Sequence, residues 1–195
     1  MNYVTEAEIT EKLKSVLKES RFIHTLGVAD TAVYLAEKYG ADKEKARIAG
    51  LLHDCAKNIP GVDAIKYCRE NGVELKEVCI HEHSLIHAYL GAYLAKSEYG
   101  VEDEEILTAI YYHTTGKENM SLLEKIIYVA DTIEPSRTQA GVDVLRTLAE
   151  TNLDSALLKA IESTIRHILN KGGILDTDTV AARNYLMIHT KKKNV

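Results

Sequence analysis

Apolar residues recur every three or four positions along most of the chain, the spacing that places side chains on one face of an α-helix. In residues 21–40, Phe22, Leu26 and Ala29 follow this spacing, and Gly40 is a typical helix end. The strict alternation of apolar and polar residues that indicates a β-strand is nowhere sustained. The pattern therefore predicts an all-α protein.

The same periodicity divides the chain into helices joined by short turns. Thr5 and Glu8 have the spacing of a capping box, and Asp42 can cap the helix that runs into His53. Residues 66–80 could contain a short strand, but we interpret them as helix and turn. The expected helices cover residues 5–20, 21–40, 42–54, 62–71, 84–100, 103–116, 121–133, 152–173 and 177–190.

The chain of 195 residues is long enough for one domain with a substantial core, and 46% of its residues are hydrophobic. No internal repeat, glycine-rich linker or shift in composition divides it. We expect one domain over residues 1–195, with an N-terminal helix within 1–19, a core over 20–187 and a solvated basic tail over 190–195.

The amino-acid composition limits the kinds of binding partner and the cellular compartment that we expect for this protein. The net charge of −5 argues against a broad nucleic-acid surface. Cys55, Cys68 and Cys79 form no CxxC pair, which fits buried apolar residues in a reducing cytoplasm. Acidic residues near the N-terminus argue against an export signal, and no apolar run approaches the roughly 20 residues of a membrane helix. We therefore expect a cytoplasmic protein with no membrane partner.

A possible metal site comes from polar residues at the ends of apolar segments. The stretch GLLHDCAKNIP ends an apolar run at His53 and Asp54, and a buried carboxylate is costly unless its charge is compensated. His24 lies in an earlier helix, and Asp131 interrupts the apolar run of a later one. Imidazole and carboxylate ligands together suit a divalent ion such as iron, manganese, cobalt or zinc.

Each of these residues also has a simpler interpretation when it is taken alone. A single helical histidine such as His24 is more often a partly buried hydrogen-bonded residue than a ligand. Asp131 could cap a helix or pair with Lys125 or Arg137. The ordered pattern H…HD…D is far more specific than any one of its members.

This pattern resembles the HD-domain metal-dependent phosphohydrolases. Four stretches resemble one subfamily more closely: RFIHTLGVADTAVYLAEKYGADKEKARIAGLLHDCAKNIP, IHAYLGAYLAKSEYGVEDEEILTAIYYHTTG, MSLLEKIIYVADTIEPSR and DTVAARNYL. These are the bacterial HD-domain symmetrical diadenosine tetraphosphate hydrolases, and the likeness spans roughly residues 20–187. It implies a single HD-domain helical bundle and an iron-dependent enzyme that cuts a dinucleoside tetraphosphate at its centre into two nucleoside diphosphates.

The resemblance also assigns roles to individual residues. The metal ligands it implies are His24, His53, Asp54 and Asp131. His87 and His113 match positions that face the phosphates or a second metal. Lys57 and Arg137 match positions that contact the nucleotide. Together with residues chosen for their chemistry and position, the expected substrate contacts are His24, Asp54, Lys57, His87, His113, Thr114, Asp131, Arg137, Gly173, Ile174, Leu175, Asp176, Thr177, Asp178 and Thr179. Of these, Thr114 and residues 173–179 come from the sequence pattern and not from the resemblance.

Asp54, Lys57 and His113 are the candidate catalytic residues for hydrolysis of a phosphoanhydride. A divalent ion lowers the pKa of bound water from about 15.7 toward about 7 and stabilises charge on phosphate. Lys57 could neutralise phosphate charge, Arg137 could clamp it bidentately, and His113 could act as general acid. Alternatively, Lys57 favours a helix C-terminus through the dipole, and Arg137 is an ordinary surface residue.

The segment before the last helix is the candidate nucleoside site. Gly172 and Gly173 let the backbone turn sharply, and residues 176–179 offer side-chain acceptors and free N–H groups at a helix start. The alternative is an ordinary capped helix. Thr114 could contact a phosphate or only close its helix, and His81 and His83 are not expected to be ligands.

Two other functions remain open from the sequence alone. One is a different HD-type hydrolase acting on nucleoside monophosphates or guanosine alarmones. The other is a non-catalytic module that senses nucleotides. The number of metal ions also stays open. We expect Tyr89 and Tyr93 to be exposed, where they could line a partner helix in a homodimer.

Overall fold

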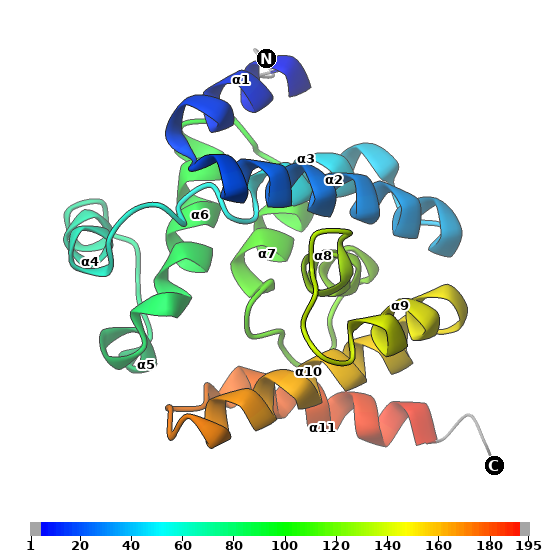
Figure 1. Cartoon of the computed structure of the whole chain (residues 1–195). Coiled ribbons are helices and arrows are strands. Elements are labelled where there is room, and N and C mark those ends of the chain that lie inside the picture. The colour runs from blue at the N-terminus through cyan, green and yellow to red at the C-terminus, as the bar shows by residue number, and fades with distance from the viewer. Residues whose placement is uncertain (1–4, 192–195) are drawn as a thin grey trace.

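Helices joined by turns make up the whole described part of the chain, residues 5–191 of the computed structural model, which contains no strand there (Figure 1). This confirms the all-α prediction. The helices are α1 (Glu6–Val16), α2 (Glu19–Tyr39), α3 (Lys43–Leu52), α4 (Gly61–Glu70), α5 (Glu77–His81), the 3₁₀ turn η1 (His83–Leu85), α6 (Ile86–Ser97), α7 (Glu104–Tyr112), α8 (Leu122–Ile133), α9 (Val142–Thr151), α10 (Leu153–Asn170) and α11 (Thr177–Lys191).

Several helix boundaries differ from the sequence-based expectation, and two helices were not expected. The single helix expected over 5–20 ends at Val16, and α2 starts at Glu19. The helices α5 and α9 were not predicted, although Val142, Leu145 and Ala149 give α9 a buried face at helical spacing. At the C-terminus α11 continues through Lys191, so 190 and 191 belong to a helix, and residues 192–195 lie outside the described part.

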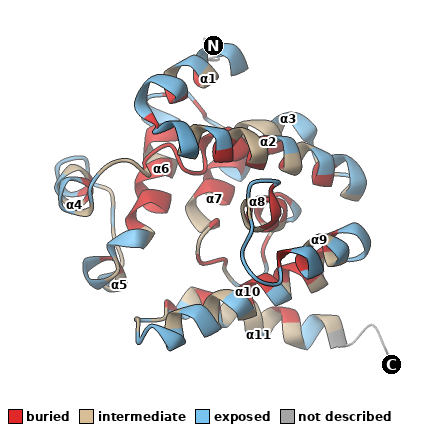
Figure 2. Cartoon of the chain, in the orientation of Figure 1, coloured by how far each residue is buried: buried red, intermediate tan, exposed pale blue. Residues whose placement is uncertain are grey.

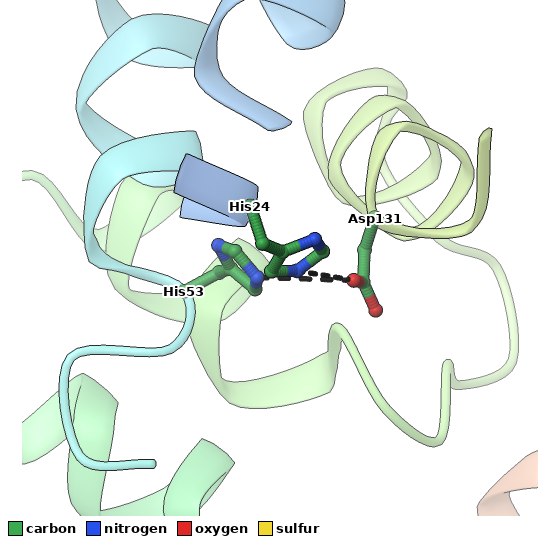
Figure 3. A group of neighbouring side chains, drawn as sticks. All are labelled: His24, His53 and Asp131. Atoms are coloured by element: carbon green, nitrogen blue, oxygen red, sulfur yellow. Dashed lines mark ion pairs between the residues drawn. The ribbon is translucent and has the colours of Figure 1, made fainter. Parts of the chain in front are cut away.

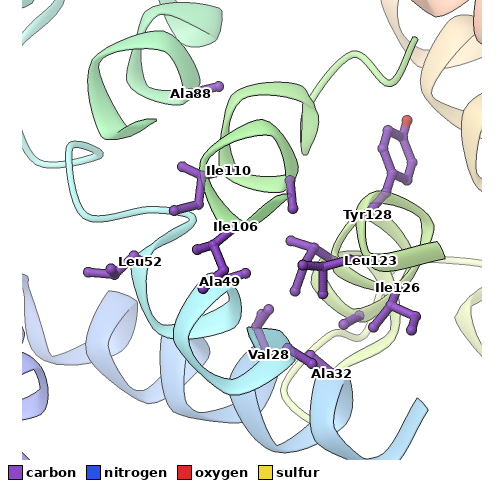
Figure 4. Close-up of a cluster of buried hydrophobic side chains, with 14 of the residues drawn as sticks. Val28, Ala32, Ala49, Leu52, Ala88, Ile106, Ile110, Leu123, Ile126 and Tyr128 are labelled. Atoms are coloured by element: carbon purple, nitrogen blue, oxygen red, sulfur yellow. The ribbon is translucent and has the colours of Figure 1, made fainter. Parts of the chain in front are cut away.

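The central core lies where α2, α3, α7 and α8 meet. The helix α2 packs against α3 and α8, and α7 packs against α3, α6 and α8. Figure 4 shows apolar side chains of these helices filling the space between them. Labelled members include Val28, Ala32, Ala49, Leu52, Ile106, Ile110, Leu123 and Ile126.

A glycine permits the close approach of α2 and α3. A Cβ atom added to Gly50 would lie 2.7 Å from the Cα atom of Ala29, closer than real Cβ contacts allow. The two helices therefore touch backbone to backbone at this point. Because His24 lies on α2 and His53 directly follows α3, this contact brings two candidate ligands together.

The helices α10 and α11 lie side by side along one edge of the molecule, beneath α7, α8 and α9 in the view of Figure 1. In Figure 2, buried residues concentrate in the central helices, while α10 and α11 alternate between buried and exposed positions. The helix α10 packs against α8, α9 and α11 through one face and leaves another face exposed.

The cysteines are free and buried, as expected of small apolar residues. Tyr89 contradicts its expected exposure: only 2% of it is exposed, and its ring packs edge-on against Tyr111 with centroids 4.5 Å apart. Tyr89 is therefore a core residue and offers no surface for a homodimer. Within residues 5–191, no helix combines the length and apolar character needed to cross a bilayer.

Candidate metal centre and nucleotide site

Four residues from three helical segments converge at the centre of the bundle. His24 comes from α2, His53 and Asp54 follow α3, and Asp131 comes from α8. Figure 3 shows His24, His53 and Asp131 converging from these segments. The His24 Nε2 atom lies 3.0 Å from Asp131 Oδ1 and 3.8 Å from Asp54 Oδ2. The His53 Nε2 atom lies 3.4 Å from Asp54 Oδ2 and 3.9 Å from Asp131 Oδ1. The structure thus brings together all four residues that the sequence pattern selected.

Hydrogen bonds on the far side of three histidine rings orient them toward this centre. In each ring the Nδ1–H donates to the backbone carbonyl three residues earlier, so the Nε2 lone pair faces inward. The carbonyl partners are Gly50 for His53, Ser84 for His87 and Ile110 for His113, each at 2.7 Å. The His87 and His113 Nε2 atoms lie 3.1 Å apart, and the former lies 3.1 Å from Asp54 Oδ1.

His24 is oriented by a carboxylate that the sequence analysis missed. Its Nδ1–H donates to Glu134 Oε1 at 2.9 Å, and Glu134 is only 1% exposed. Gly27 makes room for this carboxylate, because a Cβ atom there would lie 2.6 Å from Glu134 Oε2. The available signal was an acid three residues after Asp131, near the end of the same apolar helix.

Several polar atoms of this cluster are buried without a hydrogen-bond partner. They are His24 Nε2, His53 Nε2 and Asp54 Oδ1. Such atoms are rare in folded proteins because each loses its hydration without compensation. Two groups of donor atoms lie close enough to hold a cation, His24–His53–Asp131 and His53–Asp54–His113, and they share His53. The cluster is therefore compatible with a divalent metal.

Lys57 faces the interior of the site. Its Nζ atom lies 3.1 Å from His87 Nε2 and 3.9 Å from Asp54 Oδ1. Burial lowers the pKa of Lys57 from its ordinary value, although Asp54 opposes the shift. Burial likewise lowers the pKa of His87 to about 4, which favours its neutral form. These contacts argue against the interpretation of Lys57 as a simple helix-dipole residue.

Two arginines flank the carboxylates. Arg137 pairs with the Asp131 side chain and also donates from Nε to its carbonyl oxygen at 2.8 Å, so it is not an ordinary surface residue. Arg21, which the sequence analysis missed, lies with Nη1 2.7 Å from Asp54 Oδ2. Its signal was an arginine three residues before His24 in a predicted helix. Lys125 pairs with Asp154, so it is not the partner of Asp131.

Neighbouring side chains lower the pKa of both aspartates. Burial opposes ionisation of Asp131, but His24, His53 and Arg137 hold its pKa well below the usual range. Burial also opposes ionisation of Asp54, yet its pKa lies well below the ordinary value because of His53 and His113.

A cavity of about 280 Å³ lies beside the chain segments that carry His87 and His113. Ser84, whose carbonyl orients His87, and Thr114, which follows His113, both line it. The Thr114 Oγ1 atom is buried there without a partner, as is Asp176 Oδ2. The other Asp176 oxygen accepts from the Asp178 backbone N–H at 2.8 Å.

The predicted nucleoside segment reaches this cavity only in part. Gly173, Ile174, Asp176 and Thr179 line it. Leu175, Thr177 and Asp178 do not: the first two line a separate cavity of about 510 Å³ beside Lys76, and Asp178 forms an ion pair with Lys76. Thr177 and Asp178 lie at the start of α11, where successive residues point in different directions around the helix.

The remaining histidines lie away from the centre. His81 and His83 are exposed, and His83 Nε2–H donates to the Ile80 carbonyl at 3.2 Å. His167 and His189 are exposed on α10 and α11.

A helical bundle with paired histidines and aspartates in its core defines the HD class of metal-dependent hydrolases. The HD domain family matches residues 21–136 of the chain. The symmetrical bis(5'-nucleosyl)-tetraphosphatase of Bacillus subtilis is 45% identical over 175 residues, which cover 90% of this chain and 94% of the relative. The enzyme of the same name from Halalkalibacterium halodurans is 42% identical, with 92% and 95% covered.

A solved structure agrees with these relatives. The crystal structure of a predicted HD superfamily hydrolase involved in NAD metabolism from Clostridium acetobutylicum superposes with a TM-score of 0.91 at 50% identity, covering 95% of this chain and 98% of that one. The chain belongs to the HD-domain family of symmetrical bis(5'-nucleosyl)-tetraphosphatases.

Proposed function

We propose that the chain hydrolyses diadenosine tetraphosphate at its central anhydride and releases two molecules of ADP. The observation that best supports this proposal is the set of histidine Nε2 lone pairs and carboxylate oxygens that face the centre of the site. Several of these atoms are buried without a hydrogen-bond partner. Its relatives at 42–45% identity are named as symmetrical tetraphosphatases, which supports the same reaction.

The residues that would hold the metal are His24, His53, Asp54 and Asp131, with His87 and His113 in reach of a second ion. We propose iron as the ion, with manganese, cobalt or zinc as substitutes that the same ligands accept. When bound, a divalent ion would offset phosphate charge and make a water molecule acidic near neutral pH.

The polar residues around the cluster would bind and orient the phosphates. Lys57 supplies a compact positive charge, and Arg137 offers a planar fork to two phosphate oxygens. The oxygen of a water molecule bonds to one central phosphorus while that water gives up one proton to the solvent. The bond from this phosphorus to the bridging oxygen breaks, and the leaving ADP keeps the bridging oxygen with its electron pair. We assign His113 the donation of a proton to that oxygen. The proton would come from Nε2, because Nδ1–H is occupied by the Ile110 carbonyl.

One ADP half would occupy the 280 Å³ cavity. The unpartnered oxygens of Asp176 and Thr114 are suitable acceptors for ribose hydroxyls or an exocyclic amine of the base. Gly173 and Ile174 provide backbone at the same wall. We propose that this wall holds the nucleoside at a fixed distance from the metal centre. The reducing cytoplasm remains our proposed location, in keeping with three free thiols.

Product analysis tests this function. Metal-loaded protein incubated with diadenosine tetraphosphate should yield ADP as the sole nucleotide product. AMP with ATP would place the cut elsewhere, and phosphate released from a nucleoside monophosphate alone would identify a different HD hydrolase. Nucleotide binding without turnover, in protein shown to contain metal, would identify a sensing module.

A further inference from the structure

Asp131 of the metal centre lines a second cavity, which has a volume of about 540 Å³. Arg137, which pairs with Asp131, lines this cavity too. Gln139, Lys159 and Ser163 are further lining residues. The volume is within the usual range of small-molecule sites, roughly 300–1,000 Å³.

One helix connects this cavity with the first. Thr164 and His167 of α10 line both cavities. Lys171 lines only the first, and Lys159 lines only the second. The two cavities are therefore neighbours along α10: Thr114, next to His113, lines the first, and Asp131 lines the second.

The face of α10 that joins the cavities is exposed and basic. Lys159, Ser163, His167 and Lys171 follow one another at intervals of four residues, and all four are exposed. At 1.5 Å per residue they form a row of about 18 Å. The acidic residue Glu162 of this helix pairs with Arg166 and Arg183, and no ion pair of the described residues involves either lysine of the row. The row therefore presents uncompensated positive charge.

We propose that the second cavity holds the other nucleoside diphosphate half of the substrate, an inference that rests on the proposed function. A dinucleoside tetraphosphate has two equivalent halves, and a central cut requires that both be held while the middle phosphates face the catalytic residues. The first cavity receives one half beside His87 and His113. The second cavity receives the half beside Asp131 and Arg137, and the basic row of α10 follows the polyphosphate between them.

A third cavity near the centre does not meet these conditions. It has a volume of about 400 Å³, and Ser20, Arg21 and His24 line it. It shares no residue with the first cavity and none with α10. A substrate half placed there would lose the contact with the basic row.

Blocking each cavity with a tyrosine tests the assignment. Ser163 is exposed on α10, so Ser163→Tyr should fill part of the second cavity without disturbing the core. The control is Leu169→Tyr, which adds a tyrosine to an exposed position turned about 200° from His167 around the helix. Circular dichroism melting would verify that both variants fold. Lys159→Ala provides a second, smaller change in the same cavity.

The expected results distinguish binding of one half of the substrate in the second cavity from binding of the other half in the first. Ser163→Tyr should raise the KM for diadenosine tetraphosphate about tenfold or more, equivalent to about 1.4 kcal/mol. Lys159→Ala should raise it in the same direction. The dissociation constant of ADP, measured by calorimetry, should stay unchanged in Ser163→Tyr because the first cavity still binds ADP. Leu169→Tyr should behave like the unmodified protein in both assays.

Three outcomes would overturn the proposal. The first is an unchanged KM in both Ser163→Tyr and Lys159→Ala. The second is a matching loss of ADP affinity in Ser163→Tyr, which would place the first half in this cavity. The third is a KM that rises in Ser20→Tyr, which blocks the third cavity, but not in Ser163→Tyr. Failure of the proposed function is visible separately, because unmodified protein would then not convert the substrate to ADP.

Discussion

At the scale of single residues, each histidine of the metal centre is oriented by the hydrogen-bond acceptor of its Nδ1–H. For His53, His87 and His113 this acceptor is a backbone carbonyl, so the orientation of each ring follows from the helix end on which it lies. His24 lies within α2, where backbone carbonyls are already engaged, and it uses the Glu134 side chain. This makes Glu134 a positioning residue for one ligand.

Removal of the Glu134 carboxylate should weaken metal binding. We expect Glu134→Ala to reduce metal affinity about 10- to 100-fold, because the His24 ring loses the acceptor that fixes its orientation. Glu134→Gln is the matched control, since its amide oxygen can still accept from Nδ1–H, and it should retain most of the affinity. Competition with a chromophoric chelator measures both. Equal affinities for the two variants would show that Glu134 does not act through His24.

The positive side chains should affect turnover without affecting the metal. We expect Lys57→Ala and Arg137→Ala to retain metal but to lose about 10- to 100-fold in kcat/KM, because a charged phosphate contact contributes about 1.5–3 kcal/mol. Lys66→Ala, at an exposed lysine of α4, is the control and should leave kcat/KM unchanged. Elemental analysis checks the metal content. Unaltered kinetics in both variants would assign these residues a structural role only.

At the scale of helices, the site depends on how closely α2 and α3 approach. Gly50 leaves no room for a Cβ atom against Ala29, whereas a Cβ atom at Gly91 of α6 would meet its nearest neighbour at an ordinary 3.5 Å. Both glycines are buried in helices, so the pair separates the effect of crowding from the effect of helix propensity.

Alanine substitutions at these glycines should have opposite effects on stability. We expect Gly50→Ala to lower the free energy of unfolding by about 1–3 kcal/mol, because α2 and α3 must separate. Gly91→Ala should leave it unchanged or raise it by about 0.5–1 kcal/mol through helix propensity. Urea unfolding measures both. A destabilised Gly91→Ala with an unaffected Gly50→Ala would contradict the packing seen between α2 and α3.

At the scale of the whole molecule, the apolar core and the metal centre are separable contributions to stability. The central helices bury a continuous set of apolar side chains in addition to the polar cluster (Figures 2 and 4). The bundle should therefore remain folded without metal, and metal should add stability by binding the native state alone.

Chelation should lower the melting temperature without loss of helix content. At a free metal concentration 100 times its dissociation constant, binding adds about 2.7 kcal/mol, which is about 5–10 °C for a chain of this size. Asp54→Ala should abolish activity, and its melting temperature should not respond to metal. Far-UV circular dichroism measures the helix content and the melting temperature of the native protein and of Asp54→Ala. Unfolding of the native protein on chelation would show that the metal is required for the fold itself.

The amino-acid sequence was sufficient to predict the all-α class, most helix positions and the residues gathered at the centre. Helical periodicity and helix termination at glycine depend on interactions between residues that are close in sequence, so a short window of sequence is enough to detect them. The order His24, His53–Asp54, Asp131 was readable because each interrupts an apolar pattern where an unpaired charge would be costly. The short helix α5 and the helix α9 lacked strong flanking signals and were missed.

Tertiary packing was needed to identify the residues that support those ligands and the space in which the substrate can lie. Glu134 and Arg21 contact His24 and Asp54 across helices, and their spacing from Asp131 and His24 does not by itself separate them from surface charges. Thr177 lines a separate cavity because the direction of α11 is fixed by its packing on α10. The second cavity is formed by α8, α9, α10 and the segment between α8 and α9, so its shape follows from packing over long sequence separations.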